Sequence, residues 1–246
     1  MVSYVKGLND CLSGFGLIFK SGIRRYVIVP LLINTALFAA AIYYLSQQMD
    51  VWMAQLLPGW LSFLEWLIWP LFALTILLIV FFTFTLVANL ISAPFNSLLS
   101  ASVEQKLTGS KPQNMVEESF MKTTVRTVGA EIRKTFYFLK WLIPLVLLTI
   151  IPGLNVLSPF AWFLFAAWSL SLEYMDAPLG NRGMLFEDIR EYNRKHRLRS
   201  LGLGTGVFFM TTIPLLNFLA MPVAICAATK LTLRTSAASG YSSGSA

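Results

Sequence analysis

Long apolar stretches alternate with short basic ones along this chain. Residues 27–45 and 66–93 contain no charged side chain, and at ~1.5 Å per residue each is long enough for a helix to cross the ~30 Å core of a bilayer. Both stretches therefore predict transmembrane helices. Residues 4–19 place apolar side chains at helical spacing with polar ones mostly opposite, which predicts an amphipathic helix at the membrane interface.

Two further apolar stretches, 141–172 and 201–229, are interrupted by similar phrases, IPGLNVLSP from Ile151 and IPLLNFLAMP from Ile213. Proline lacks an N–H group and bends a helix, and the asparagine amide can bond to backbone groups that the bend exposes. Residues 141–172 are too many for one regular span and too few for two. We therefore predict two half-penetrating hairpins; a pair of kinked single spans is the alternative.

The predicted fold class is an all-α integral membrane protein with two long transmembrane helices, two half-penetrating re-entrant helical hairpins and amphipathic interfacial helices. Residues 121–140 add a basic amphipathic helix before the first hairpin. Residues 1–234 form a single membrane domain in this prediction. Residues 235–246 are rich in serine, glycine and alanine, which predicts a disordered tail.

Composition and charge support the membrane class and give an orientation. Of 246 residues, 56% are hydrophobic and 13% are charged, which is more apolar than an ordinary soluble domain. The net charge of +7 is spread beside the apolar stretches rather than gathered in a basic domain, so nucleic-acid binding is not expected. None of the 19 Lys and Arg residues lies at 46–65, between the two predicted spans. By the positive-inside rule, residues 46–65 face outward and both termini are cytoplasmic.

The sequence does not predict an enzyme. It has no protease, hydrolase or nucleotide-binding motif and no cluster of acids, bases and nucleophiles. Cys11 and Cys226 lie in apolar surroundings without metal-ligand spacing, and His196 lies among cations, so we expect no metal or other cofactor. Glu173 and Asp176 are the nearest pair of carboxylates, either as the polar end of a helix or as a site of proton coupling.

The most informative short motif is SGIRR, from Ser21 to Arg25. Gly22 can end the interfacial helix with a positive φ, and Ser21 can cap the helix that follows. The first N–H groups of that helix then lie beside the guanidinium groups of Arg24 and Arg25, an arrangement that suits a tetrahedral oxyanion. Arginines before a span also simply orient it in the membrane, and the residues alone leave both interpretations open.

Three separate segments resemble the CysZ family of bacterial inner-membrane sulfate permeases. They read GIRRYVIVPLLIN from Gly22, ISAPFNSLLSASVEQKLTG from Ile91 and IPLLNFLAMPVAICAAT from Ile213. The similarity extends over residues 15–229, and the motifs occur in the family's order.

This resemblance implies a permease that imports sulfate across the inner membrane to supply cysteine biosynthesis, by proton symport or as a channel. It also implies a sulfate site at a Gly-x-Arg-Arg helix N-terminus, formed here by Gly22, Ile23, Arg24 and Arg25.

A sulfate dianion that crosses the bilayer needs replacement donors at every depth. Polar side chains in the spans and hairpin bends are the available groups: Asn34, Thr83, Thr85, Asn89, Asn155 and Asn217. They can equally hydrogen-bond between membrane helices. Two full spans give little wall for a pore, so we expect a homo-oligomer, with membrane lipid as a further partner. The alternative function is a non-transporting membrane organiser that binds lipid or a partner protein.

Overall fold

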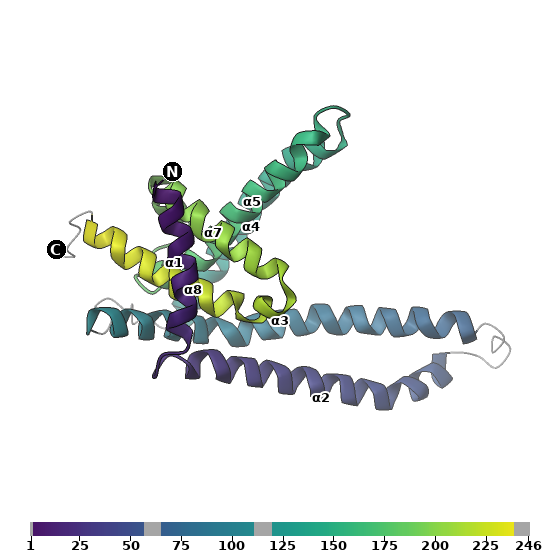
Figure 1. Ribbon diagram of the computed structural model, residues 1–246. Coiled ribbons are helices and arrows are strands. Elements are labelled where there is room, and N and C mark those ends of the chain that lie inside the picture. The colour runs from purple at the N-terminus through teal and green to yellow at the C-terminus, as the bar shows by residue number, and fades with distance from the viewer. Residues whose placement is uncertain (1, 57–64, 111–119, 239–246) are drawn as a thin grey trace. The chain divides into compact units, whose positions relative to one another are not determined.

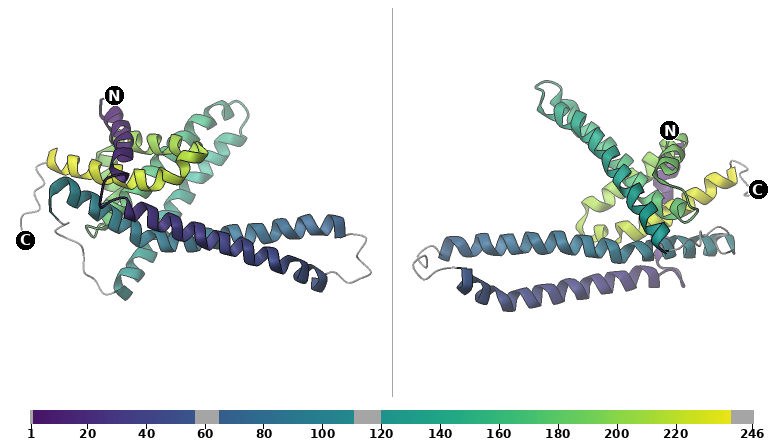
Figure 2. Two further views of the ribbon diagram at one scale, coloured as in Figure 1. Left: turned by 60° about the horizontal axis from the view of Figure 1, so that its bottom comes forward. Right: turned by 180° about the vertical axis from the view of Figure 1, so that it is seen from behind.

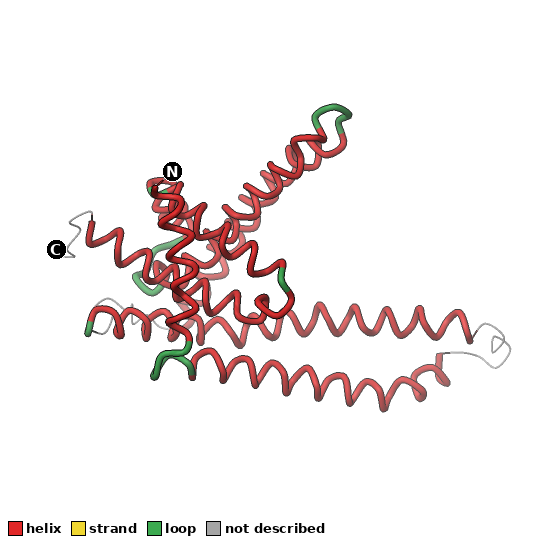
Figure 3. The backbone as a smooth tube through the Cα atoms, in the orientation of Figure 1, coloured by secondary structure: helices red, strands yellow, loops and turns green. Residues whose placement is uncertain are grey.

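Every regular element that the computed structural model describes is a helix, which confirms the all-α fold class (Figures 1 and 3). The backbone is described for residues 2–56, 65–110 and 120–238. Side chains are described in these ranges except at 49–50, 53–54, 56, 65, 79–94, 120–128, 130–131 and 237–238. The helices are α1 (Val2–Ile18), α2 (Arg25–Leu56), α3 (Glu65–Thr108), α4 (Phe120–Ile150), the 3-10 helix η2 (Asn155–Leu157), α5 (Ser158–Gly180), α6 (Phe186–Lys195), α7 (Arg197–Thr212) and α8 (Pro214–Ala238).

The chain divides into two compact units, one formed by Met1–Arg24 with Asn96–Ala246 and the other by Arg25–Phe95. The division falls at the start of α2 and within α3. The single membrane domain at 1–234 stays a prediction.

The second unit consists of α2 and the first part of α3, which run beside each other in opposite directions (Figures 1 and 2). Residues Arg25–Gln48 of α2 form a 24-residue segment that is apolar and long enough to cross a membrane. In α3 the described apolar segment is Trp66–Leu78. Both predicted spans, 27–45 and 66–93, therefore lie inside helices.

In the first unit, α1 packs against α7 and α8, and α7 also packs against α5. Glycines allow these close approaches. A Cβ atom at Gly202 would lie 2.2 Å from the carbonyl oxygen of Tyr4 in α1. A Cβ atom at Gly204 would lie 1.7 Å from the carbonyl oxygen of Ala167 in α5. Neither distance leaves room for a side chain, and small residues at the contact are typical of membrane helix packing.

Two helical hairpins, α4–α5 and α7–α8, belong to the first unit, and loops mark their tips (Figure 3). At the first tip Gly153 has a φ of 85°, a conformation that glycine adopts readily. At the second tip Ile213 is extended and Pro214 begins α8, because a residue before proline avoids the helical conformation. Both bends therefore lie where the repeated Ile-Pro phrases predicted them.

The helices of the hairpins are longer than the predicted limbs. The basic amphipathic segment and the first limb form one continuous helix, α4, which passes through Lys140 and includes Pro144. By length and composition, Asn155–Gly180 and Pro214–Ser236 could each cross a membrane, so insertion to half depth stays a prediction. The tail prediction was wrong for residues 235–238, which are helical in α8, and residues 239–246 lie outside the described residues.

The last part of α3 belongs to the first unit, where polar contacts hold it beside α5. Ser97 Oγ donates to Asn181 Oδ1 at 2.5 Å, and Asn181 Nδ2 donates to the carbonyl oxygen of Ser97 at 2.9 Å. About two turns further along α3, Glu104 Oε1 lies 3.2 Å from Arg182 Nη2. These contacts hold the end of α3 beside the end of α5.

Candidate anion site at the turn after the first helix

The turn between α1 and α2 is fixed by backbone hydrogen bonds around Lys20. The Lys20 N–H donates to the carbonyl oxygen of Leu17 at 3.0 Å. The Lys20 carbonyl in turn accepts the N–H groups of Ile23 at 3.1 Å and Arg24 at 3.2 Å. Gly22 has a φ of 88°, which residues with a side chain rarely adopt, so glycine is required at this position. The predicted role of Gly22 as the residue that turns the chain is confirmed.

Ile23 anchors this turn in the first unit. Its side chain is 1% exposed, whereas Arg24 and Arg25 on either side of the division between the units are exposed. Its N–H group donates to the Lys20 carbonyl, and its part in the anion site stays a prediction. Ile23 thus positions the turn through its buried side chain.

The predicted capping role of Ser21 was also wrong, because α2 begins only at Arg25. Ser21 therefore lies within the turn and too far from the first turn of α2 to cap it. The first turn of an α-helix still has N–H groups that no carbonyl within the helix can accept. The positive end of the helix dipole lies at this point of the chain.

Arg24 and Arg25 are the exposed cations of the turn. Arg25 Nη2 donates to Tyr26 Oη at 2.8 Å, and its guanidinium carbon lies 4.7 Å from the centre of the Tyr26 ring. These contacts orient the guanidinium group but use one of its five N–H donors. Within the described residues, no carboxylate forms an ion pair with Arg24 or Arg25. Both guanidinium groups therefore have N–H donors that could bind an external anion.

The predicted pathway residues belong to both units of the chain, and their role in a pathway stays a prediction. Asn34 is half-buried in α2, while Asn155 and Asn217 are exposed at the two hairpins. The Asn155 N–H donates to the carbonyl oxygen of Ile151 at 3.1 Å, and the Asn217 N–H to that of Ile213 at 2.9 Å, so both backbones stabilise their bends. The two tips lie apart in every view (Figures 1 and 2).

Three other predicted pathway residues, Thr83, Thr85 and Asn89, lie on α3 with side chains outside those described. The structure gives their place in the helix and nothing of their contacts.

The two candidate proton-coupling residues lie on the last turns of α5. Glu173 Oε2 lies 2.9 Å from Lys134 Nζ, whose side chain is 9% exposed. Asp176 is exposed one turn further along the helix. Because α5 continues through Pro178 to Gly180, the pair does not mark the end of the helix, and that interpretation was wrong. Glu173 instead balances a buried cation of α4.

Sequence analysis missed a buried carboxylate that joins three helices. Asp10 of α1 is 0% exposed, and its Oδ2 accepts Nε and Nη2 of Arg199 in α7 at 2.9 and 2.6 Å. Its Oδ1 accepts Nη1 of Arg234 in α8 at 2.5 Å. The signal was present, since Asp10 shares a helix face with Gly7 and Gly14, which also face α7 and α8.

Asp10 thus lies on the face of α1 that packs against α7 and α8, while the place of α1 at the membrane interface stays a prediction. Burial also raises the pKa of the Cys11 thiol to about 12, so this cysteine stays protonated and serves as a packing residue. At the start of α7, burial together with Arg199 and Lys195 lowers the pKa of His196, which keeps the imidazole neutral at pH 7.

Comparison with known proteins identifies the family. A family model described as "Sulfate transporter CysZ/Etoposide-induced protein 2.4" matches residues 11–222. This chain belongs to that family. A protein named Sulfate transporter CysZ from Pectobacterium atrosepticum is 40% identical over 229 residues, which cover 92% of this chain and 83% of the relative. A protein of the same name from Vibrio cholerae serotype O1 is 40% identical over 234 residues, with 94% of each chain covered.

The family match confirms the resemblance that the three sequence motifs indicated, and it contains the whole turn from Gly22 to Arg25. The CysZ family is one of transporters rather than enzymes, as the names of its members say. Helices long and apolar enough to cross a membrane agree with a transmembrane protein.

Proposed function

We propose that this CysZ-family protein is a permease that imports sulfate across the bacterial inner membrane and thereby supplies cysteine biosynthesis. Support comes from family membership, from two relatives named as sulfate transporters, and from helices of transmembrane length. The proposed orientation places both termini in the cytoplasm, since all 19 Lys and Arg residues lie outside residues 46–65. Homo-oligomers and bound lipid belong to the same proposal.

The observation that carries the proposal is the turn at Gly22–Arg25. It presents two adjacent guanidinium groups without a carboxylate partner in the described chain, on a backbone held by the Lys20 carbonyl. A tetrahedral dianion has four oxygens, which forked arginine donors and a helix N-terminus can satisfy together. Arg24 and Arg25 bind the sulfate, the Gly22 backbone closes around it, and Ile23 holds the turn in place.

Affinity at this turn has to be moderate, because a transported ion must also leave its site. Exposed guanidinium groups suit this requirement, since water competes for their donors. Asn34, Thr83, Thr85, Asn89, Asn155 and Asn217 are the further donors that the pathway needs at greater depth. Glu173, which pairs with Lys134, and Asp176 are the two carboxylates proposed for proton coupling.

Radiolabelled sulfate uptake into proteoliposomes tests this function. Arg24→Ala with Arg25→Ala should lower uptake by about tenfold or more, because each charge-assisted bond contributes ~1.5–3 kcal/mol. The matched control is Arg194→Ala with Lys195→Ala, which removes two adjacent exposed cations of α6 and should transport normally. Absence of uptake by the wild-type protein would favour a membrane organiser. Normal uptake by the Arg24, Arg25 variant would refute the site.

An imposed pH gradient tests coupling in the same vesicles. If Glu173 couples protons, Glu173→Gln should transport sulfate down its own gradient but lose the stimulation by an inward proton gradient. Stimulation that persists in this variant would remove Glu173 from the coupling mechanism.

A further inference from the structure

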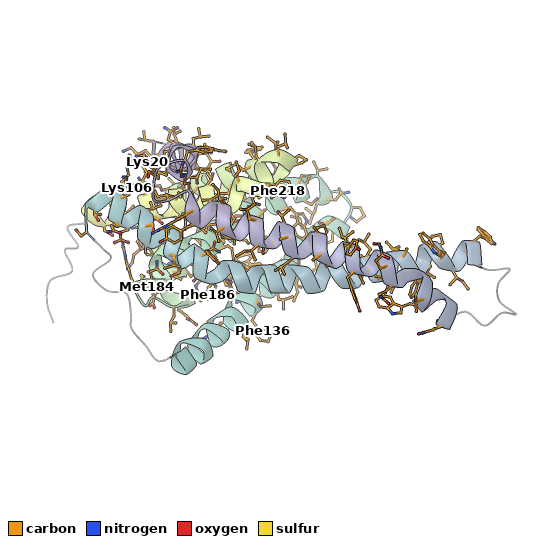
Figure 4. The ribbon with its side chains drawn as sticks, turned by 90° about the horizontal axis from the view of Figure 1, so that it is seen from below. Lys20, Lys106, Phe136, Met184, Phe186 and Phe218 are labelled. Carbon is orange, nitrogen blue, oxygen red and sulfur yellow. The ribbon has the colours of Figure 1, made fainter. Side chains whose placement is uncertain are left out.

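The two arginines of the proposed anion turn are held in different ways. The carbonyl oxygen of Lys20 accepts the Arg24 N–H at 3.2 Å, which fixes the backbone of Arg24 (Lys20 is labelled in Figure 4). Among the residues that the structure describes, none forms a hydrogen bond, ion pair or ring contact with the Arg24 side chain. The Arg25 side chain, by contrast, has a partner in Tyr26, the second residue of α2. The guanidinium group of Arg25 is therefore ordered before an anion arrives.

Tyr26 contacts this guanidinium group through both its hydroxyl and its ring. Arg25 Nη2 donates to Tyr26 Oη at 2.8 Å, and the guanidinium carbon lies 4.7 Å from the centre of the ring. The ring attracts the positive charge by a cation–π interaction, while the hydrogen bond fixes the direction of one N–H group. A tyrosine side chain has only two χ angles, and Tyr26 is half-buried whereas Arg25 is exposed. Tyr26 is thus the rigid partner of the pair.

The hydrogen bond to Tyr26 leaves Arg25 the donors that an oxyanion needs. A guanidinium group has five N–H donors, and two of its edges each present a parallel pair of them. Because a single N–H of Nη2 is engaged by Tyr26, at most one of these pairs is interrupted. The other pair stays available, and two parallel N–H groups are the arrangement that binds two oxygens of a tetrahedral anion.

Order in the free protein matters for the affinity of such a site. An exposed arginine has several rotatable bonds, and it loses much of their freedom when its guanidinium group binds a ligand. A contact that already orders this group in the free protein removes part of that entropic penalty from the binding step. Arg25 held by Tyr26 therefore binds an anion more tightly than an arginine that rotates freely.

We propose that Tyr26 is a positioning residue for anion binding, which holds the Arg25 guanidinium group in the conformation that receives sulfate. This inference rests on the proposed function, because the ligand is the transported anion. Tyr26 acts through Arg25 and without touching the anion itself. Its effect is on the affinity for sulfate, so it changes the Michaelis constant (KM) of uptake rather than the maximal rate (Vmax).

Initial rates of radiolabelled sulfate uptake into proteoliposomes, measured over a range of sulfate concentrations, test this role. Tyr26→Phe removes the hydroxyl and keeps the ring, and it should raise KM about threefold with Vmax unchanged, the effect of losing one hydrogen bond. Tyr26→Leu also removes the ring and should raise KM about tenfold. The matched controls are Tyr43→Phe and Tyr43→Leu, at an exposed position further along α2, which should keep the wild-type KM.

A double-mutant cycle shows whether Tyr26 acts through Arg25. Arg25→Ala alone should raise KM, and adding Tyr26→Phe should raise it no further, because the group that the tyrosine positions is gone. Equal effects of Tyr26→Phe with and without Arg25 would overturn the proposal. A wild-type KM in both Tyr26 variants would also overturn it, and so would a change confined to Vmax, which would mean that Tyr26 serves folding or insertion.

The arginine variants separate this inference from the proposed function. A raised KM in Arg25→Ala, together with wild-type kinetics in both Tyr26 variants, would refute the role of Tyr26 and leave the anion turn standing. Normal uptake by Arg24→Ala with Arg25→Ala would refute the turn, and this inference with it.

Discussion

Two helices of similar apolar character, α8 and α2, have opposite environments. In an apolar 18-residue stretch of α8, 56% of the residues are buried inside the protein, whereas in the corresponding stretch of α2 the figure is 0%. The buried face of α8 consists mainly of small side chains: Ala220, Val223, Ala224, Cys226, Ala227 and Ala228. The exposed side chains of α2 include several large ones: Leu32, Phe38, Ile42, Tyr43 and Tyr44.

Hydropathy therefore identifies both helices as membrane segments but does not show which of them packs against protein, and in α8 the packing is accompanied by small side chains at most of the buried positions. Lipid tails are as apolar as leucine, so burial inside the protein gains little from hydrophobicity alone. Small residues allow backbones to approach, and dispersion contacts and hydrogen bonds then stabilise the packing. The turn that we propose for anion binding lies where the chain passes from the first unit to the second, between Arg24 and Arg25.

The largest effect should come from the buried charge of the packed region. Asp10→Asn leaves Arg199 and Arg234 facing each other without a counter-charge, which should lower the free energy of unfolding by ~3–5 kcal/mol. Unfolding by denaturant in mixed micelles measures this change. Glu191→Gln, which breaks only exposed ion pairs of α6, should cost at most about 1 kcal/mol. Equal effects of the two variants would contradict the role of Asp10 in joining α1, α7 and α8.

Leucine truncations compare the packed and exposed helices directly. Leu231→Ala in α8 removes a side chain that is 0% exposed and should cost ~2–5 kcal/mol of unfolding free energy. Leu32→Ala in α2 removes one that is 62% exposed and should change stability by ~0.5 kcal/mol or less. The same unfolding measurement applies to both. A large cost at Leu32 would show that this face of α2 is covered in the assembled protein.

Glycine substitutions should give a smaller effect that differs in sign between two positions. Gly204→Ala places a methyl group against the backbone of α5 and should destabilise the protein by ~1–3 kcal/mol, because the helices must separate. Gly16→Ala in α1 meets no atom within 4 Å, and it should stabilise the helix by ~0.5–1 kcal/mol. Melting temperatures of the two variants and the wild-type protein, measured in the same detergent, would give the sign and order of these effects. Tolerance of Gly204→Ala would contradict the close approach of α7 and α5.

The smallest effect concerns reactivity. The raised pKa of Cys11, about 12, leaves almost no thiolate at pH 8, so the native protein should resist maleimide at this position. Mass spectrometry of the labelled protein should show modification of Cys11 only after unfolding. Rapid labelling of the native protein would show that α1 detaches from α7 and α8.

Much of the fold follows from local sequence, because proline and glycine act where they stand. The Ile-Pro phrases at Ile151 and Ile213 predicted both bends, and Gly22 predicted the turn before α2. Lys140 misled the prediction of the first hairpin, since a charged residue ends an apolar stretch without ending a helix. The contacts between helices that are distant in the chain depend on tertiary packing, which local sequence does not specify.

Only part of the candidate site could be predicted from the sequence, because some of its features depend on contacts between residues far apart in the chain. Arg24 and Arg25 were identified from the sequence because they are two adjacent cations directly before a predicted transmembrane helix. The hydrogen bonds of Lys20 and the burial of Ile23 depend on contacts that adjacent residues do not specify. Asp10 was assigned to a polar face because its partners, Arg199 and Arg234, lie far along the chain.

The central claim is that the turn from Gly22 to Arg25 binds the transported anion. Selenate has the shape and charge of sulfate, and its selenium gives an anomalous X-ray signal. A crystal of the protein grown with selenate should show an anomalous peak within hydrogen-bonding distance, about 3 Å, of the Arg24 or Arg25 guanidinium nitrogens. Arg24→Ala with Arg25→Ala should abolish that peak. Selenate bound elsewhere, with this turn empty in the wild-type protein, would contradict the account.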